Sequence, residues 1–165
     1  MPLTTPNETP FQDLMPGNFC WGCGPTVETG LKLKSTWDGV EAVCEWTPRP
    51  EFAAGPKQVL YGGIISAVMD CHSIWTAIAT VYRDESRAVG SDPLVWYVTG
   101  SLKVSYRKPT PLDAPLKLTS HVESKTDRKS IVTCALVSEG EERAIGEVVA
   151  IRVPLDWFTQ RTHQG

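Results

Sequence analysis

The chain has 165 residues and a formal net charge of −3, with 41% hydrophobic and 21% charged residues. This length and composition are typical of one globular domain that buries its own core, and the slight negative charge without a basic run argues against a nucleic-acid partner. Five cysteines, and a start without the charged and apolar regions of a signal peptide, predict free thiols in a cytoplasmic protein. We expect no membrane partner, because no apolar segment looks long and unbroken enough to span a bilayer.

The first third of the chain predicts an arm, a tight turn and two strands. Residues 1–18 hold four prolines among polar residues and predict an N-terminal arm. The Gly-rich segment 20–24 predicts a tight turn. Alternation of Leu and Lys over 31–34 predicts a half-buried strand, and residues 40–46, which follow an Asp-Gly turn, predict the returning strand. A loop is expected over 47–60.

One long helix is predicted from about Gly63 to Tyr82, the only long stretch with helical periodicity and no Pro or Gly inside it. At 100° per residue, six side chains share the face that should pack on the core: Ile64, Val68, Cys71, Trp75, Ile78 and Tyr82. Four small or polar side chains share a flank: Ser66, Asp70, Ser73 and Ala77. Asp70 is the single carboxylate in this apolar run, and an acid in a mostly buried helix requires an explanation.

Four more strands are predicted after the helix. They cover 94–106, 116–122, 130–137 and 144–153, and 130–137 is apolar enough to be central. Short turns join the later strands, which makes them antiparallel. A sheet of about six strands has an apolar face to cover, and only the long helix can cover it. The sequence therefore predicts an α+β fold over 19–155, an antiparallel sheet wrapped around one helix, with a C-terminal tail at 156–165.

Three short motifs occur in an informative order along the chain. Cys-Trp-Gly-Cys-Gly at 20–24 precedes Gly-Leu at 30–31. Tyr-Gly-Gly at 61–63 opens the helix, and Asp70 follows after a gap of six residues. The strand 98–109 ends in an aromatic residue, two basic residues and a proline. Together these motifs resemble those of the hotdog-fold acyl-CoA thioesterases, in particular the PaaI-like (4-hydroxybenzoyl-CoA thioesterase-like) group, which usually has His-Gly-Gly where this chain has Tyr-Gly-Gly.

The resemblance implies a hotdog fold assembled as a homodimer or homotetramer, with the active site between subunits. It implies that Asp70 is the general base or nucleophile, that the backbone N–H of Gly63 polarises the thioester carbonyl, and that Thr99 positions water. Further substrate contacts are expected from four neighbouring residues: Tyr61, Gly62, His72 and Ser73. No cofactor is expected apart from the coenzyme A that is part of the substrate.

Each of these residues also has a purely structural interpretation. Asp70 could pair with a basic residue of a neighbouring strand, the glycines could simply start a helix, Thr99 could be an ordinary strand residue, and Tyr61 could be a packing aromatic. His72 points about 200° away from Asp70 around the helix, so the two cannot form a dyad within one helix. We therefore favour a buried, hydrogen-bonded His72, with a role across a subunit interface left open.

A metal site is not predicted. Cys20 and Cys23 supply two of the four ligands that zinc needs, and the other cysteines, Cys44, Cys71 and Cys134, are scattered over the predicted strands and helix. The Cys-x-x-Cys segment is therefore expected to be a tight turn that packs against the body of the domain.

The function expected from the sequence is hydrolysis of an acyl-CoA or related thioester to a free acid and CoA. Three aromatic residues, Trp75, Trp96 and Tyr97, are candidates to line the acyl pocket. Two alternatives stay open: an acyl-CoA hydratase or dehydratase of the same superfamily, and a non-catalytic acyl-CoA-binding module, which the replacement of the usual His by Tyr61 favours.

Overall fold

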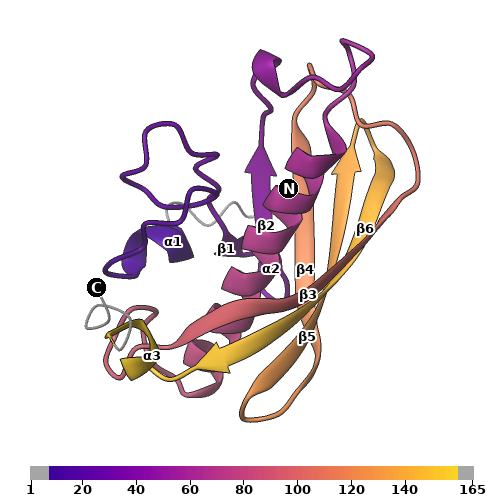
Figure 1. Ribbon diagram of the computed structural model, residues 1–165. Coiled ribbons are helices and arrows are strands. Elements are labelled where there is room, and N and C mark those ends of the chain that lie inside the picture. The colour runs from indigo at the N-terminus through magenta and orange to yellow at the C-terminus, as the bar shows by residue number, and fades with distance from the viewer. Residues whose placement is uncertain (1–7, 160–165) are drawn as a thin grey trace.

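A six-stranded antiparallel sheet curls around one long helix in the computed structural model, which describes residues 8–159 (Figure 1). The strands run in the order β1-β2-β4-β5-β6-β3 across the sheet. They are β1 (Thr36–Trp37), β2 (Ala42–Trp46), β3 (Trp96–Tyr106), β4 (Leu116–Lys125), β5 (Lys129–Ser138) and β6 (Glu141–Val153). The helices are α1 (Phe11–Leu14), α2 (Gly62–Asp84) and α3 (Asp156–Thr159), with a 3-10 helix at Pro50–Phe52. This architecture confirms the predicted α+β fold, and β5 is central as expected.

The two predicted terminal segments lie partly outside the described residues. Within the described part of the first segment, α1 and the residue that follows it dock on the domain through Phe11 and Met15, which are both buried. The boundaries proposed at 18 and 155 stay predictions.

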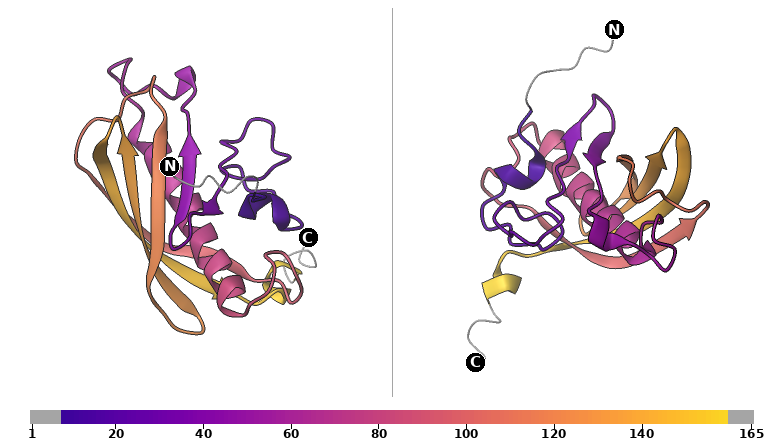
Figure 2. Two further views of the ribbon diagram at one scale, coloured as in Figure 1. Left: turned by 180° about the vertical axis from the view of Figure 1, so that it is seen from behind. Right: turned by 90° about the horizontal axis from the view of Figure 1, so that it is seen from above.

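The helix α2 forms the centre of the core, and the concave face of the sheet covers it (Figure 2). It matches the predicted helix but is rotated relative to the predicted core face. Ser73 and Ala77, expected on an open flank, are buried, whereas Ile64 and Cys71, expected in the core, are only half-buried. The sheet wraps around more of the helix than one apolar stripe, and small side chains on that side let the strands approach the helix closely.

By length and apolar composition α2 could cross a membrane, contrary to the expectation that no segment could. In the most apolar 18-residue stretch of α2, 56% is buried inside the domain. The core helix of a globular domain meets the same test, and burial against the sheet accounts for this one.

Residues 31–34 do not form the predicted strand. The N–H of Leu31 donates to the carbonyl of Trp21 at 3.1 Å, that of Leu33 donates to Gly22 at 3.2 Å, and Lys32 has a φ of 54°. The burial of Leu31 and Leu33 does alternate with that of their lysine neighbours, as predicted. Their hydrogen bonds tie the Cys-x-x-Cys turn to the domain instead of extending the sheet, because a left-handed residue cannot continue a strand ladder.

The strand β3 lies at one end of the sheet and pairs, among the described residues, with β6 alone. Its register shifts between Thr99 and Ser101, which makes Gly100 the extra residue of a β-bulge. A Cβ at Gly100 would lie 2.8 Å from Cγ1 of Ile151, so a glycine fits this close approach. Bulges bend a strand and redirect its side chains, and this one adjoins Thr99, which faces α2.

Candidate active site

Asp70 and Thr99 meet where β3 crosses α2. The Thr99 hydroxyl donates a 2.6 Å hydrogen bond to Oδ1 of the half-buried Asp70 carboxylate. Burial raises the pKa of Asp70, the Thr99 hydrogen bond opposes this, and the nearby Cys20 adds to the increase. Among residues 8–159 no lysine or arginine forms an ion pair with Asp70. The carboxylate is therefore a stronger base than an exposed aspartate. The structural alternative, an ion pair with a basic residue of a neighbouring strand, is not found among these residues.

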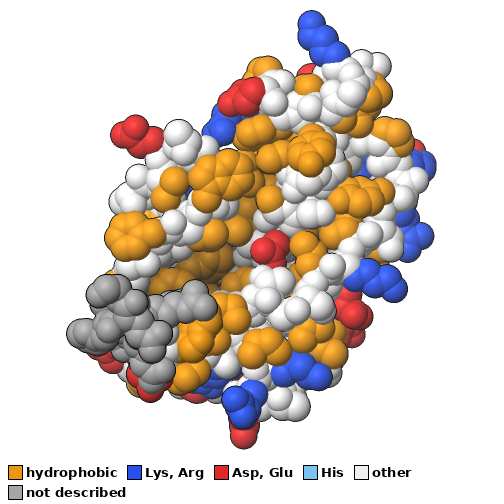
Figure 3. All heavy atoms as spheres, viewed as in Figure 1, with side chains coloured by type: hydrophobic (Ala, Val, Ile, Leu, Met, Phe, Trp, Pro, Cys, Tyr) orange, Lys and Arg blue, Asp and Glu red, His pale blue; other side chains and the backbone are white. Residues whose placement is uncertain are grey.

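A mainly apolar pocket of about 260 Å³ opens beside this pair. The expected aromatic residues, Trp75, Trp96 and Tyr97, contribute to its wall. A second pocket of about 480 Å³ adjoins it and shares Cys20 and Trp96. Figure 3 shows a hollow on this face that is bordered by hydrophobic side chains, with an acidic side chain at its rim. An apolar cavity with one convergent acid is the usual form of a small-molecule site.

A larger hollow of about 530 Å³ lies near the other end of α2, around Arg83 and His121. Its polar groups already have partners. Arg83 donates to the Gly39 carbonyl and stacks 3.6 Å from the centre of the Trp37 ring, and His121 contacts Glu41. We therefore place the candidate active site at Asp70.

The N-terminus of α2 presents free backbone donors. Tyr61 precedes the helix, and its carbonyl accepts hydrogen bonds from Ile64 and Ile65. In the part of the chain that the structure describes, the N–H groups of Gly62 and Gly63 donate to no protein acceptor. Unpaired N–H groups at a helix N-terminus, where the helix dipole is positive, are suited to binding a developing negative charge.

The Tyr61 ring covers Gly63. A Cβ at Gly63 would lie 2.5 Å from Cε1 of Tyr61 and 2.9 Å from its hydroxyl oxygen, closer than any side chain tolerates. Tyr61 is 56% exposed, so it lies at the surface and is not a core aromatic. Tyr61 therefore lies next to the predicted oxyanion donor.

Tyr106 is a site residue that sequence reasoning did not single out. Its hydroxyl donates to the Gly62 carbonyl at 2.8 Å and lies 2.7 Å from Oγ of Ser66. These bonds fix the end of β3 to the first turn of α2. The signal was the aromatic residue before the basic pair and proline, which appeared only as part of a motif.

His72 and Ser73 do not lie in the pocket, which corrects their assignment as substrate contacts. His72 is fully buried between Oγ of Ser35, 2.8 Å from Nδ1, and the Ala42 carbonyl, 3.1 Å from Nε2. Ser73 is also fully buried, on the side of α2 that faces the Cys134 thiol. Both side chains point to the sheet because α2 turns that side toward β2, β4 and β5.

We expect His72 to make the protein sensitive to acid. Burial lowers the pKa of His72 from 6.5 to about 4. Below pH 6.5 this histidine binds a proton in the unfolded chain but stays neutral in the native chain. The free energy of unfolding therefore decreases as the pH falls from 6.5 to about 4, by about 3 kcal/mol in total. Urea unfolding of the wild type and of His72→Gln at about pH 7 and about pH 4 measures this. Equal losses in the two proteins would exclude His72 as the cause.

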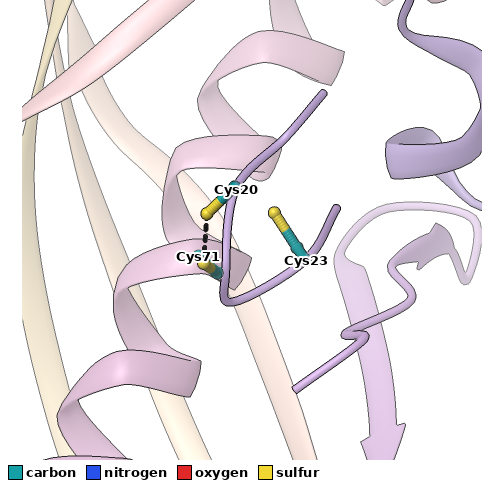
Figure 4. Close-up of side chains that lie close together, drawn as sticks. All are labelled: Cys20, Cys23 and Cys71. Carbon is teal, nitrogen blue, oxygen red and sulfur yellow. Dashed lines mark hydrogen bonds between the residues drawn. The ribbon is translucent and has the colours of Figure 1, made fainter. Parts of the chain in front are cut away.

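The structure brings a third cysteine to the Cys-x-x-Cys turn. The Cys71 thiol, on α2 next to Asp70, lies 3.6 Å from the Cys20 thiol, and all three sulfur atoms lie within 4.8 Å of one another (Figure 4). Sequence analysis treated Cys71 as an isolated residue because it is remote from Cys20 and Cys23 along the chain. No sequence signal joins them, since the contact depends on how the loop packs on the helix.

The fold and part of the sequence resemble solved structures. A thioesterase superfamily protein from Shewanella loihica is 30% identical, with a TM-score of 0.61; the match covers 74% of this chain and 91% of that one. A putative thioesterase from Ralstonia eutropha, related to phenylacetic acid degradation, is 16% identical over 79% of this chain and 92% of its own, with a TM-score of 0.63. The PaaI protein of E. coli is 15% identical, with a TM-score of 0.60, over 75% and 81% of the two chains. The last two likenesses concern the fold alone.

No family model matches the chain. No curated protein matches it either.

Proposed function

The chain belongs to the thioesterase superfamily of hotdog-fold proteins, and from this premise we propose that it hydrolyses an acyl-CoA or related thioester to a free acid and a free thiol. One observation carries the proposal: the Asp70 carboxylate, with a raised pKa and a Thr99 hydrogen bond, lies at the edge of an apolar pocket. A hydrolase for a thioester with an apolar acyl group needs this combination of base and pocket.

Thr99 holds one oxygen of the Asp70 carboxylate and leaves the other for chemistry. That oxygen takes a proton from water as the hydroxyl adds to the acyl carbon, or attacks the acyl carbon itself to form an anhydride that water then opens. In both routes the carbon–sulfur bond breaks and the thiolate leaves. The acyl group lies against the aromatic wall of Trp75, Trp96 and Tyr97. This chemistry needs no cofactor beyond the substrate's own CoA.

The proposed oxyanion donor and the base lie too far apart along α2 for a direct attack of Asp70 on a carbonyl held by Gly63 of the same chain. Asp70 follows Gly63 by seven residues, about 10 Å along the helix axis at 1.5 Å per residue. An oxyanion donor must lie about 3 Å from the oxygen, and the attacking atom lies at a similar distance from the carbon. We therefore propose a homodimer in which Asp70 of one copy works with the Gly63 N–H of a second copy.

The edge of the sheet supports this assembly. The strand β3, with Thr99 on it, has one unpaired edge among the described residues. An unpaired edge strand is a natural template for pairing with a second copy. Such pairing brings the two α2 helices close to the same junction. A homodimer is the smallest assembly that completes the site, and a dimer of dimers keeps it intact. The cytoplasmic location and the absence of membrane or nucleic-acid partners stay predictions from composition.

We expect Thr99→Val to lower kcat about 10- to 100-fold. The substitution keeps the shape of the side chain and removes one hydrogen bond to a carboxylate, and bonds to charged groups contribute about 1.5–3 kcal/mol. KM should change little, because the lost bond holds the base and not the substrate. Steady-state kinetics with an acyl-CoA measure both constants, and Thr99→Ser, which keeps the hydroxyl, should retain most of the activity. Equal losses in Val and Ser variants would show that the hydroxyl is not what matters.

Thiol release from a panel of acyl-CoAs tests the function itself. The panel should contain short, long and aromatic acyl groups, because an apolar pocket can accept any of them. We expect catalytic release of CoA thiol from at least one member. Hydration of an enoyl-CoA without thiol release would support the hydratase alternative, and tight binding without turnover would support a binding module.

A further inference from the structure

The three cysteine side chains at the active-site rim form a cluster that the proposed hydrolysis does not use. Cys20 and Cys23 come from the loop before β1, and Cys71 comes from the middle of α2. Figure 4 shows the Cys20 and Cys71 thiols directed at each other, with the Cys23 thiol beside them. The loop is pressed onto the helix so closely that a Cβ at Gly22 would overlap the Cys71 sulfur. The sequence therefore needs a glycine there to let the three thiols meet.

The spacing of the sulfur atoms suits a single metal ion. Four-coordinate zinc binds thiolate at about 2.3 Å, which places two sulfur ligands about 3.8 Å apart. The Cys20 and Cys71 sulfur atoms are 3.6 Å apart, and no pair in the cluster exceeds 4.8 Å. The largest sulfur–sulfur distance therefore exceeds the ~3.8 Å of two zinc ligands by about 1 Å at most. Small side-chain rotations would bring all three sulfur atoms to coordination distance.

Two hydrogen-bond donors approach the Cys23 sulfur atom. Nε1 of Trp75 donates to the Cys23 sulfur at 3.1 Å, and the Asn18 amide lies 3.9 Å from the same atom. Side-chain hydrogen bonds with Cys23 and Cys71 lower the pKa of the Cys20 thiol, whereas hydrogen bonding to Cys20 and burial raise the pKa of Cys23 to about 11 and that of Cys71 well above its usual value. Ionisation of all three thiols therefore requires the charge of a bound cation. Donors around thiolate ligands are the usual outer shell of a metal–cysteine site.

We propose that Cys20, Cys23 and Cys71 bind one thiophilic metal ion, Zn²⁺, as three thiolate ligands. Soft thiolate donors select zinc over hard cations such as Mg²⁺ or Ca²⁺. Three cysteines and Asp70 all line the same pocket, so water from the pocket can supply the fourth ligand. On binding, each coordinating thiol releases its proton to solvent. The ion would fasten the loop at 18–24 to α2 beside the catalytic carboxylate.

A disulfide is the competing use of these thiols. A Cys20–Cys71 or Cys20–Cys23 bond would engage two sulfur atoms and leave the third, whereas a metal engages all three. The buried Trp75 N–H donates to the Cys23 sulfur, and a metal-bound thiolate accepts such a bond more strongly than a disulfide sulfur does. These observations favour the metal, and the experiment separates the two.

Titration of reduced, metal-free, full-length protein with Co²⁺ tests the proposal without reference to thioester hydrolysis. We expect sulfur-to-cobalt charge-transfer bands in the near ultraviolet and intense visible bands of four-coordinate cobalt, saturating at one ion per chain. Zn²⁺ should displace Co²⁺, abolish these bands and protect three thiols from a thiol reagent. Single variants Cys20→Ser and Cys71→Ser should weaken Zn²⁺ binding by more than about 100-fold, since even outer-shell changes cost up to about that much.

Cys134→Ala serves as the matched control, because Cys134 is a buried cysteine outside the cluster. It should bind Zn²⁺ like the wild type. Circular dichroism of each metal-free variant checks that it is folded, and Cys20, which is exposed, is the substitution that disturbs packing least. Absence of the cobalt bands in folded wild type, or equal Zn²⁺ binding by Cys20→Ser, would overturn the proposal. So would loss of two thiols to a disulfide in air with no protection by Zn²⁺.

Discussion

Asp70→Asn is expected to lower kcat for thioester hydrolysis by about 100- to 10,000-fold, the usual contribution of a general base. Asparagine has the same shape and can still accept the Thr99 hydrogen bond, but it cannot take a proton from water or attack the thioester. The fold should be preserved, because burial already disfavours the charged form of this group. Initial rates of thiol release and thermal melts of the two proteins measure the two effects. Near-wild-type turnover would remove Asp70 from the mechanism.

Asp84→Asn is the matched control for that substitution. Asp84 ends the same helix, is exposed, and pairs with Lys125 far from the pocket. An exposed ion pair contributes little to stability, about 0–1 kcal/mol. The control should therefore hydrolyse thioesters at the wild-type rate, and a parallel loss of activity in both variants would indicate a general effect of charge on α2.

Gly63→Ala is expected to lower kcat/KM by about 100-fold. Alanine keeps the backbone N–H, but its methyl group and the displaced Tyr61 ring hinder a carbonyl from reaching that donor, and loss of an oxyanion-hole donor has about this effect. The new methyl group would lie 2.5 Å from the Tyr61 ring, so the ring must leave its place beside Gly63. Gly62→Ala is the matched control, because its methyl group would meet the Tyr106 ring at an ordinary 3.4 Å. Kinetics of the two alanine variants should differ strongly although the positions are adjacent. Similar activity in both would contradict the role given to the Gly63 backbone.

Mixing the two defective proteins tests whether base and donor come from different copies. If they do, a dimer of one Asp70→Asn chain and one Gly63→Ala chain has one site with both groups intact. Random reassociation should then restore roughly a quarter of the wild-type activity, because half of the dimers are mixed and each has one intact site of two. Base and donor acting within one chain would restore nothing, and that outcome would exclude the proposed shared site.

The elements that sequence predicted well are those with strong local periodicity. The helix and the strands after it follow from patterns that neighbouring residues set, and the apolar run at 130–137 forms β5, which has a strand on each side. The segment 31–34 has the burial pattern of a strand, yet its N–H groups bond to the turn at Trp21 and Gly22. A pattern of side chains specifies which residues are buried, but not which carbonyls their N–H groups meet.

The site was predictable where it depended on one element and not where it depended on packing between elements. Asp70 was singled out from one helix and its opening glycines, and in the structure the Thr99 hydroxyl donates a hydrogen bond to its carboxylate. His72 is the buried, hydrogen-bonded histidine that the sequence favoured. Its place among the substrate contacts, like that of Ser73, was wrong because a helix with a sheet curled around it buries more than one stripe. The meeting of Cys71 with the Cys-x-x-Cys turn depends on a loop folded against the helix, which no local pattern encodes.

Product analysis of one reaction tests the central claim most directly. The protein should be incubated with the acyl-CoA that it turns over fastest, and free acid and free CoA thiol should be quantified together. We expect both to form catalytically and at equal rates, and we expect Asp70→Asn to form neither above background. Consumption of the acyl-CoA without release of thiol, or equal rates in the two proteins, would contradict the central claim.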